Sequence, residues 1–190
     1  ETIFDMYDKA LNKLDNNEFD ALVVGNQGAR AFCAGANVLM ILMGAMQQDW
    51  ASIETSLDRL QKLMMRAKYS TKPVVTAPYG LTLGGGCEVA MHSAATVASG
   101  ELYMGLVEVG VGLIPGAGGC KELVIRYLGD VPQDVNYDPI PFVSKAFERI
   151  GMANVSSSAE EARAWGMLRP TDRVVLDGDA VLATAKQLAR

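Results

Sequence analysis

The sequence predicts an α/β fold in a single domain. Short apolar runs typical of buried strands alternate with longer segments of helical periodicity, and two glycine-rich turns each come directly before a helical segment. The 190 residues, of which 49% are hydrophobic and 21% charged, are enough for one substantial core. Because the chain contains no internal repeat and no low-complexity segment, we expect one domain over residues 1–190.

The expected elements follow one another along the chain. Apolar residues at helical spacing predict an opening helix; they are Ile3, Phe4, Tyr7, Leu11 and Leu14. Strands are expected at 21–25, 73–76, 96–98 and 102–104. Further helices are expected at 38–46, 50–64, 87–95, 120–128, 141–152, 159–165 and 179–190. The polar segment 129–139 is expected to be a surface loop between a sheet-containing part, 1–128, and a helical C-terminal part, 140–190.

Charge and cysteine content argue against several function classes. The net charge of −5 disfavours nonspecific nucleic-acid binding, which depends on basic surfaces. Three scattered cysteines give neither a disulfide framework nor the spacing of a zinc site, so no metal is expected. No signal-peptide pattern is visible, and the longest apolar run, 38–46, is too short to cross a bilayer. We therefore expect a cytoplasmic protein without membrane insertion.

Two glycine-containing turns could each present backbone N–H groups to a ligand. The first, 32–37, precedes the helix expected at 38–46, and the second, 83–88, leads into the helix expected at 87–95. Helix N-termini expose unpaired N–H groups with partial positive charge, and glycines let a ligand approach the backbone. Two such turns facing each other could aim two N–H groups at one oxygen, as an oxyanion hole requires. The alternative is a pair of tight turns without a ligand.

Two carboxylates in apolar surroundings are the candidate acid–base groups. Glu88 begins an otherwise apolar helical segment beside the second turn, and Glu108 lies in the almost wholly apolar stretch 104–112. A buried carboxylate is costly unless it is paired or used, and burial raises its pKa toward neutrality. The alternatives are that Glu88 complements a helix dipole and that Glu108 forms a buried ion pair.

Three other patterns have plainer interpretations. The segment 110–115 begins like a dinucleotide-binding fingerprint but has a proline in place of the third glycine, so no nicotinamide site is expected in this chain. The single histidine, His92, has no serine elbow to partner it and is interpreted as a packing or surface residue. Five methionines are interpreted as a soft core, with a lining for acyl chains as the alternative; they are Met40, Met43, Met46, Met64 and Met65.

Together these motifs resemble the crotonase, or enoyl-CoA hydratase/isomerase, superfamily. The segments 34–37 and 84–88 resemble its two oxyanion segments, Glu108 lies twenty positions after Glu88, and the Pro-Gly-Ala-Gly-Gly motif at 115–119 comes next. The resemblance covers about residues 4–190. It implies a ββα spiral core with a helical C-terminal region.

The segments 40–43, 72–75 and 103–112 look closer still to one branch of that superfamily. This branch is the hydratase domain of bacterial bifunctional proteins that also carry a 3-hydroxyacyl-CoA dehydrogenase domain. The resemblance then implies a piece that lacks the family's opening strands and last helices, and a homo-oligomer based on a trimer. No cofactor is expected in this piece, because coenzyme A belongs to the substrate and NAD would serve only the dehydrogenase domain.

The resemblance also implies a catalytic role for four residues. The backbone amides of Ala36 and Gly85 would hold the thioester oxygen of the substrate. Glu88 would help to deprotonate a water molecule, and Glu108 would deliver a proton to C2. The implied activity is the hydration of 2-enoyl-CoA to 3-hydroxyacyl-CoA in fatty acid β-oxidation.

The implied binding residues lie beside these four. The amide of Gly116 would help to hold the attacking water, and backbone near Ala34 and Val38 would meet the adenine end of coenzyme A. Two positions depart from the family pattern, because Asn37 stands where hydratases usually have Asp and Leu39 replaces a frequent lysine.

Other functions stay open at this point. Isomerases of the superfamily tend to keep the second glutamate and lose the first, so the presence of both Glu88 and Glu108 favours a hydratase over an isomerase. A catalytically silent assembly domain of a larger dehydrogenase is the alternative from a different class. A nucleotide-binding oxidoreductase domain is a third interpretation, with only the incomplete fingerprint at 110–115 in its favour.

Overall fold

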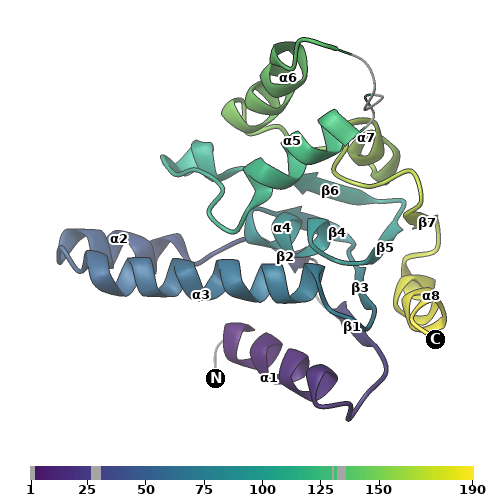
Figure 1. Ribbon diagram of the computed structural model, residues 1–190. Helices are drawn as coiled ribbons and strands as arrows, with labels where there is room; N and C mark the ends of the chain where they lie inside the picture. The colour runs from purple at the N-terminus through teal and green to yellow at the C-terminus, as the bar shows by residue number, and fades with distance from the viewer. Residues whose placement is uncertain (1–2, 27–30, 130, 132–135) are drawn as a thin grey trace.

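The chain alternates between two small parallel sheets (Figure 1). The fold is described from a computed structural model for residues 3–26, 31–129, 131 and 136–190. The first sheet has the order β1-β3-β5-β7, made of Leu22–Gly25, Val74–Ala77, Ala95–Ser99 and Arg173–Val175. The second has the order β2-β4-β6, made of Ala31–Cys33, Gly80–Leu83 and Leu102–Gly105. Each pair of successive strands contributes one strand to each sheet, which produces a spiral.

Helices pack around the two sheets, except that α2 (Val38–Met46) and the first half of α3 (Trp50–Lys68) extend away from them (Figure 1). The N-terminal half contributes α1 (Ile3–Asp15), α2, α3 and α4 (Gly85–Met91). The C-terminal half contributes α5 (Gly119–Gly129), α6 (Ile140–Gly151), α7 (Ala159–Ala164) and α8 (Val181–Leu188). Two short 3₁₀ helices are η1 (Glu108–Val111) and η2 (Gly178–Ala180). The α/β class and the helical C-terminal region are confirmed.

The predicted secondary structure was wrong in several places, both in strands that were missed and in the end of one helix. The strands β2, β4 and β7 were not predicted from the sequence, and the helix expected at 87–95 is α4, which ends at Met91 so that Ala95 opens β5. Two of the missed strands, β2 and β7, are three residues long, and β4 is interrupted by Gly80 and Thr82, so none of them shows the apolar run that identified β1 and β3. Of the loop expected at 129–139, residues 130 and 132–135 lie outside the described residues.

Two core clusters hold α4 in place. On one side, α4 packs its Cys87 and Met91 with Leu102 and Met104 of β6 and with Leu123 of α5. On the other, a cluster joins α1, α3 and β3, with Val89 of α4 packed against it; its buried members include Leu11, Leu14, Leu63, Met64 and Val74. Burial of each such side chain contributes about 1.5–3 kcal/mol, so α4 is held by apolar packing on both sides.

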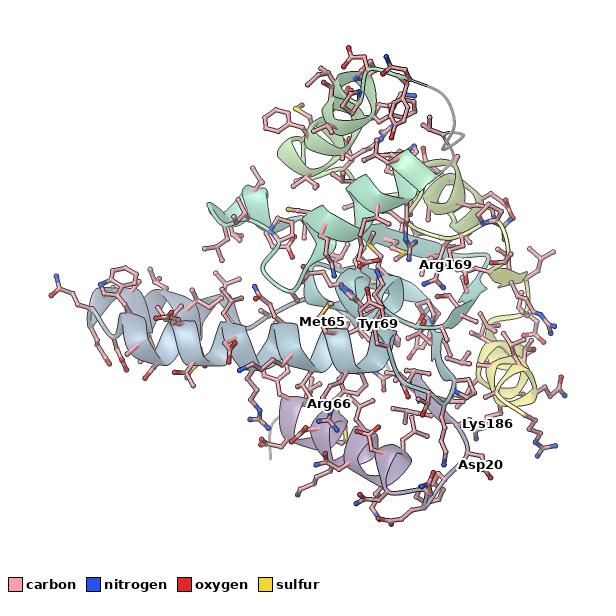
Figure 2. All side chains as sticks on the ribbon, in the orientation of Figure 1. Asp20, Met65, Arg66, Tyr69, Arg169 and Lys186 are labelled. Carbon is pink, nitrogen blue, oxygen red and sulfur yellow. The ribbon has the colours of Figure 1, made fainter. Side chains whose placement is uncertain are left out.

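The C-terminal region is also fastened to the end of α4 by polar contacts. Arg169, labelled in Figure 2, donates hydrogen bonds to the carbonyls of Ala94 and Ser93 at 3.0 and 2.6 Å. The carboxylate of Asp172 accepts a hydrogen bond from the backbone N–H of Thr96 at 2.8 Å. These contacts satisfy backbone groups at the α4–β5 connection and fix where that helix ends.

The interpretation of the methionines as a soft core was wrong for four of the five. Met64 is 1% exposed, whereas Met65 is 38% exposed and the three methionines of α2, at positions 40, 43 and 46, are between 46% and 77% exposed. In Figure 1, α2 and the first half of α3 extend away from the sheets, which explains why so apolar a helix has no buried residue. No helix within the described ranges is long and apolar enough to cross a membrane.

Candidate active site

The two glycine turns predicted from the sequence lie against each other. Gly35, after β2, has φ +99°, and Gly84, after β4, has φ +51°, which are conformations that glycine adopts without strain. A Cβ atom added at Gly84 would lie 3.6 Å from Cα of Gly35. Because β2 and β4 are neighbouring parallel strands, their ends meet at the same edge of the second sheet.

Four of the five residues expected to present backbone groups lie along these turns or directly after them. Gly85 is the first residue of α4, so its N–H has no carbonyl one helical turn earlier to bond. A Cβ atom added at Gly85 would meet no described atom within 4 Å, so the space on that side of the Gly85 Cα is open. Ala34 and Ala36 are exposed on the segment between β2 and α2, and Val38, which opens α2, is 40% exposed. The amides of Ala36 and Gly85 stay predicted ligands of the thioester oxygen, and the backbone near Ala34 and Val38 stays a predicted contact of the adenine end of coenzyme A.

Glu88 lies in the first turn of α4 and is 2% exposed. Its Oε1 atom accepts hydrogen bonds from the backbone N–H groups of Ala117 and Gly119, both at 2.8 Å. The helix-dipole interpretation is therefore incomplete, because the carboxylate is held by a second segment of the chain. A carboxylate that accepts two backbone hydrogen bonds has a fixed position, and Glu88 is held in this way.

Glu108 opens η1 and approaches the second glycine turn from the other side. A Cβ atom added at Gly84 would lie 3.1 Å from Oε1 of Glu108 and would press on this carboxylate, and the positive φ of Gly84 also favours glycine there. The Oε2 atom of Glu108 is buried and has no hydrogen-bond partner among the described residues. The buried ion pair that was the alternative interpretation is not found in that part of the chain. An unpaired buried carboxylate oxygen is costly, and such groups are frequently functional.

The surroundings of both carboxyl groups shift their pKa values upward, toward neutral pH. Burial raises the pKa of Glu88 to about 7; the amides of Gly119 and Ala117 oppose this rise and the nearby Glu108 adds to it. Burial also raises the pKa of Glu108. Both carboxyl groups therefore bind a proton more readily than an exposed glutamate does, as acid–base exchange near neutral pH requires.

The Pro-Gly-Ala-Gly-Gly segment holds Glu88 through residues that sequence reasoning missed. The sequence directed attention to Gly116, whose carbonyl accepts a hydrogen bond from Nε2 of Gln61 at 2.7 Å. The N–H groups that bond Glu88 belong to Ala117 and Gly119. Backbone donors have no side-chain signature, but a glycine-rich segment directly before a helix was a usable signal. The water-holding role of the Gly116 amide stays a prediction.

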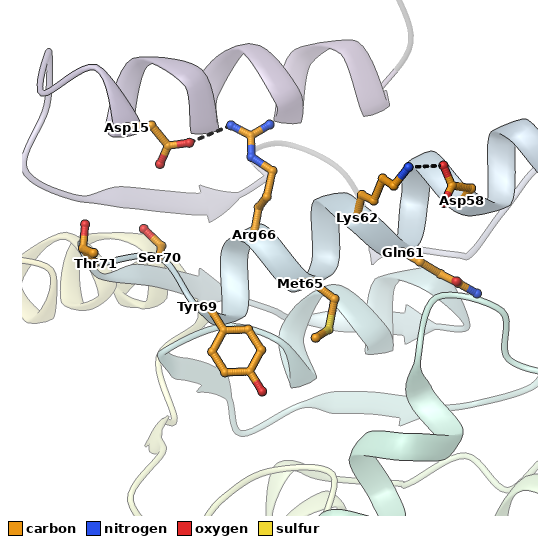
Figure 3. Close-up of a pocket in the computed structure, with 9 residues that line it drawn as sticks. All are labelled: Asp15, Asp58, Gln61, Lys62, Met65, Arg66, Tyr69, Ser70 and Thr71. Carbon is orange, nitrogen blue, oxygen red and sulfur yellow. Dashed lines mark hydrogen bonds and ion pairs between the residues drawn. The ribbon is translucent and has the colours of Figure 1, made fainter.

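A hollow of about 800 Å³ runs along α3, and neither of these carboxylates nor any residue of the two glycine turns is among its lining residues. Figure 3 shows Arg66 on its wall, directed at Asp15, with the pair Lys62–Asp58 one turn away. Arg66 is bonded to Asp8 at 2.6 Å and to Asp15 at 2.7 Å. These cations are paired with neighbouring carboxylates. We therefore interpret the hollow as part of the structural contact between α1 and α3. Within the described ranges, no three His, Cys, Asp or Glu side chains gather as a metal site would require.

Comparisons with known proteins give the family. A family model described as enoyl-CoA hydratase/isomerase matches residues 1–127. A probable 3-hydroxyacyl-CoA dehydrogenase of Bacillus subtilis (strain 168) is 47% identical over 187 residues, which are 98% of this chain and 23% of that protein. A crotonyl-CoA hydratase of Syntrophomonas wolfei is 28% identical over 163 residues, which are 85% of this chain and 60% of that protein.

A solved structure confirms the crotonase-like fold. The enoyl-CoA hydratase from Bacillus anthracis matches with a TM-score of 0.75 and 24% identity, covering 98% of this chain and 64% of that chain. This chain therefore spans less than two thirds of each of these three proteins. The family model covers more than half of the chain, and it covers both glycine turns and both glutamates. The chain belongs to the enoyl-CoA hydratase/isomerase family.

Proposed function

We propose that this chain adds water across the double bond of 2-enoyl-CoA thioesters, with Glu88 and Glu108 as the acid–base pair. One observation carries the proposal: the glycine turns touch each other between two carboxyl groups, one held by two amides and one with an unpaired buried oxygen. Two carboxyl groups beside two open helix N-termini match the requirements of enolate chemistry.

The reaction follows from the positions of these groups. The Glu88 carboxylate takes a proton from water as the water oxygen bonds to C3 of the substrate. The electrons of the C2=C3 bond move toward the thioester carbonyl, and its oxygen gains negative charge. The amides of Ala36 and Gly85 would stabilise that charge, and one such donor is worth roughly 3–4 kcal/mol of barrier. Glu108 then gives its proton to C2, which completes the addition of one water molecule.

The remaining site residues fit a thioester carried by coenzyme A. Ala34 and Val38 lie on the exposed side of the first turn, where the adenine end of a bound coenzyme A could contact backbone. The amide of Gly116 is one residue away from the Ala117 N–H that bonds Glu88, and we assign it to the attacking water. The exposed methionines of α2 would give a flexible lining for acyl chains.

The wider setting of the proposal is β-oxidation of fatty acids. The relative from Bacillus subtilis is named as a probable 3-hydroxyacyl-CoA dehydrogenase, and a relative from Rickettsia felis is named as a putative fatty acid oxidation complex trifunctional enzyme. We propose a cytoplasmic bifunctional protein in which this chain supplies the hydratase step and NAD serves only a dehydrogenase domain. We also propose that the protein forms a homo-oligomer based on a trimer.

A spectroscopic assay of the intact protein tests this function. Hydration of crotonyl-CoA removes its conjugated ultraviolet absorbance, so the proposal predicts loss of that absorbance with time. Isomerisation of a 3-enoyl-CoA would instead create the conjugated absorbance and would support the isomerase alternative. A protein that changes neither substrate is a silent assembly domain, and that result contradicts the proposal.

A further inference from the structure

Next to Glu88 lies a charged cluster, buried at His92 and Glu122 and partly exposed at its two lysines, that the proposed mechanism does not use. Four side chains make it: Lys68 of α3, His92 at the end of α4, and Lys121 and Glu122 of α5. His92 is fully buried and Glu122 is 3% exposed. Since burying a carboxylate and an imidazole among lysines is costly and rarely increases stability, a positioning role is the physical alternative.

The geometry of the ring identifies what His92 contacts. Its Nδ1 atom lies 2.8 Å from the backbone carbonyl oxygen of Glu88, and that oxygen can only accept, so Nδ1 carries the proton. Burial lowers the pKa of His92, which favours the neutral ring. The other nitrogen, Nε2, then accepts a hydrogen bond from Nζ of Lys121, 3.3 Å away.

The same ring also lies directly against the segment that bonds the Glu88 carboxylate. A Cβ atom added at Gly118 would lie 3.0 Å from Nε2 of His92, and Gly118 has φ +105°. Gly118 stands between Ala117 and Gly119, whose N–H groups both bond Oε1 of Glu88. His92 therefore touches the backbone of Glu88 on one side and, on the other, the turn that holds its carboxylate.

Lys121 is the donor to this ring, and Glu122 acts on the ring through that lysine, because Nε2 and the Glu122 oxygen are both acceptors. Oε1 of Glu122 lies 2.6 Å from Nζ of Lys68, 3.0 Å from Nζ of Lys121 and 3.4 Å from Nε2 of His92. The backbone N–H of Glu122 also donates to the carbonyl of Gly118 at 3.0 Å. Lys121 contacts the sulfur of Met65 on α3, a residue labelled in Figure 2. The cluster thus joins α3, α4 and α5 at the point where the Glu88 carboxylate is held.

We propose that His92, oriented by Lys121 and Glu122, is a positioning residue that keeps the Ala117–Gly119 turn against the carboxylate of Glu88. The inference deepens the proposed hydratase function and rests on it for its kinetic readout. His92 touches neither substrate nor reacting atoms, so its effect reaches the chemistry only through the two amides that bond Glu88.

Three variants of the intact protein test this role: His92→Leu, Glu122→Gln and, as the matched control, Ser93→Ala. Ser93 is buried on the next position of the chain and bonds the carbonyl of Ala90 and the hydroxyl of Thr76, away from the Gly118 turn. For His92→Leu we expect kcat to fall about tenfold with KM changed less than about twofold, because substrate contacts stay intact. Glu122→Gln should show a smaller change in the same direction.

A second readout separates positioning from a merely structural role. Weaker amide bonds to Glu88 leave its carboxylate less stabilised, so the acid limb of the kcat/KM profile should move to higher pH by about half a unit or more in His92→Leu. The control should show no movement, even if its melting temperature falls. If His92→Leu does not fold, His92→Gln replaces it, with the same direction expected because no single amide reproduces both ring contacts.

Infrared titration of the Glu88 carboxyl band, assigned by its loss in Glu88→Gln, gives the same answer without turnover. An upward shift of that titration in the His92 variant supports the proposal even if the wild type hydrates no thioester, in which case only the hydratase function fails. An unchanged titration in the His92 variants, or an equal shift in Ser93→Ala, overturns the proposal.

Discussion

Replacing Glu88 by Gln should make the protein more stable at high pH while it removes the proposed base. The pKa of Glu88 rises from its ordinary 4.5 to about 7 in the folded protein, and each unit corresponds to roughly 1.4 kcal/mol, so ionising this carboxyl group costs ~3 kcal/mol more in the folded chain than in the unfolded chain. Gln resembles the protonated acid and does not bear this cost.

The direction of the pKa shift of Glu88 determines the pH range in which the variant and the wild type differ in stability. A carboxyl group whose folded pKa is raised binds its proton more tightly in the folded state, so its stabilising contribution is complete below about pH 4.5 and is lost as the pH rises through about 7. The free energy of unfolding of Glu88→Gln should therefore equal that of the wild type near pH 4.5 and exceed it by up to ~3 kcal/mol at pH 8.

The assay is urea unfolding of both proteins at pH values from 4.5 to 8. Glu122→Gln is the matched contrast, because Glu122 is as buried as Glu88 but its pKa is lowered; burial raises it, and hydrogen bonds from Lys68 and Lys121 outweigh burial. This variant should be less stable than the wild type at pH 7, and the loss should shrink as the pH falls. A Glu88→Gln curve that stays parallel to the wild type at every pH would refute the reasoning.

Three further outcomes follow from the geometry. In Gly119→Ala, the added Cβ would lie 2.6 Å from Leu106 Cδ2 and 3.1 Å from Glu88 Cγ, so steady-state kinetics should show a fall in kcat of at least about tenfold. In Gly86→Ala, the Cβ would lie 2.9 Å from the backbone oxygen of Cys33, so urea unfolding should show a loss of about 1–3 kcal/mol as α4 is pushed from β2. For the wild type, kcat/KM should fall about tenfold per pH unit below about pH 7 as Glu88 is protonated; a profile that is flat from pH 5 to 8 would contradict the assigned base.

Local patterning made part of the fold predictable. The helices α1 and α3 repeat apolar residues at helical spacing, and β1 and β3 are continuous apolar runs, so each carries its own signal. The strand β4 does not, because it opens with Gly80 and its exposure varies from one residue to the next. The apolar composition of α2 predicted burial wrongly, since composition does not show that a helix extends away from the sheets.

The candidate site divides in the same way. Glu88 and Glu108 could be found because a charged residue within an apolar stretch can be recognised from the sequence alone. The hydrogen-bond partners of Glu88 could not be predicted, because almost every residue type carries a backbone N–H group. His92 was predicted to be a packing or surface residue and is buried, but the contacts behind the proposed positioning role could not be foreseen, because Lys68 and Glu122 lie 54 positions apart and meet only in the folded chain.

The most direct test of the acid–base pair is the rate of crotonyl-CoA hydration by Glu88→Gln and Glu108→Gln in the intact protein. Each should lower kcat by at least about a hundredfold, and the double variant should lose little more, because the two groups act on one water molecule and one proton. Glu101→Gln, an exposed carboxylate between β5 and β6, serves as the control and should keep the wild-type rate. Wild-type rates in either of the first two variants would contradict the account.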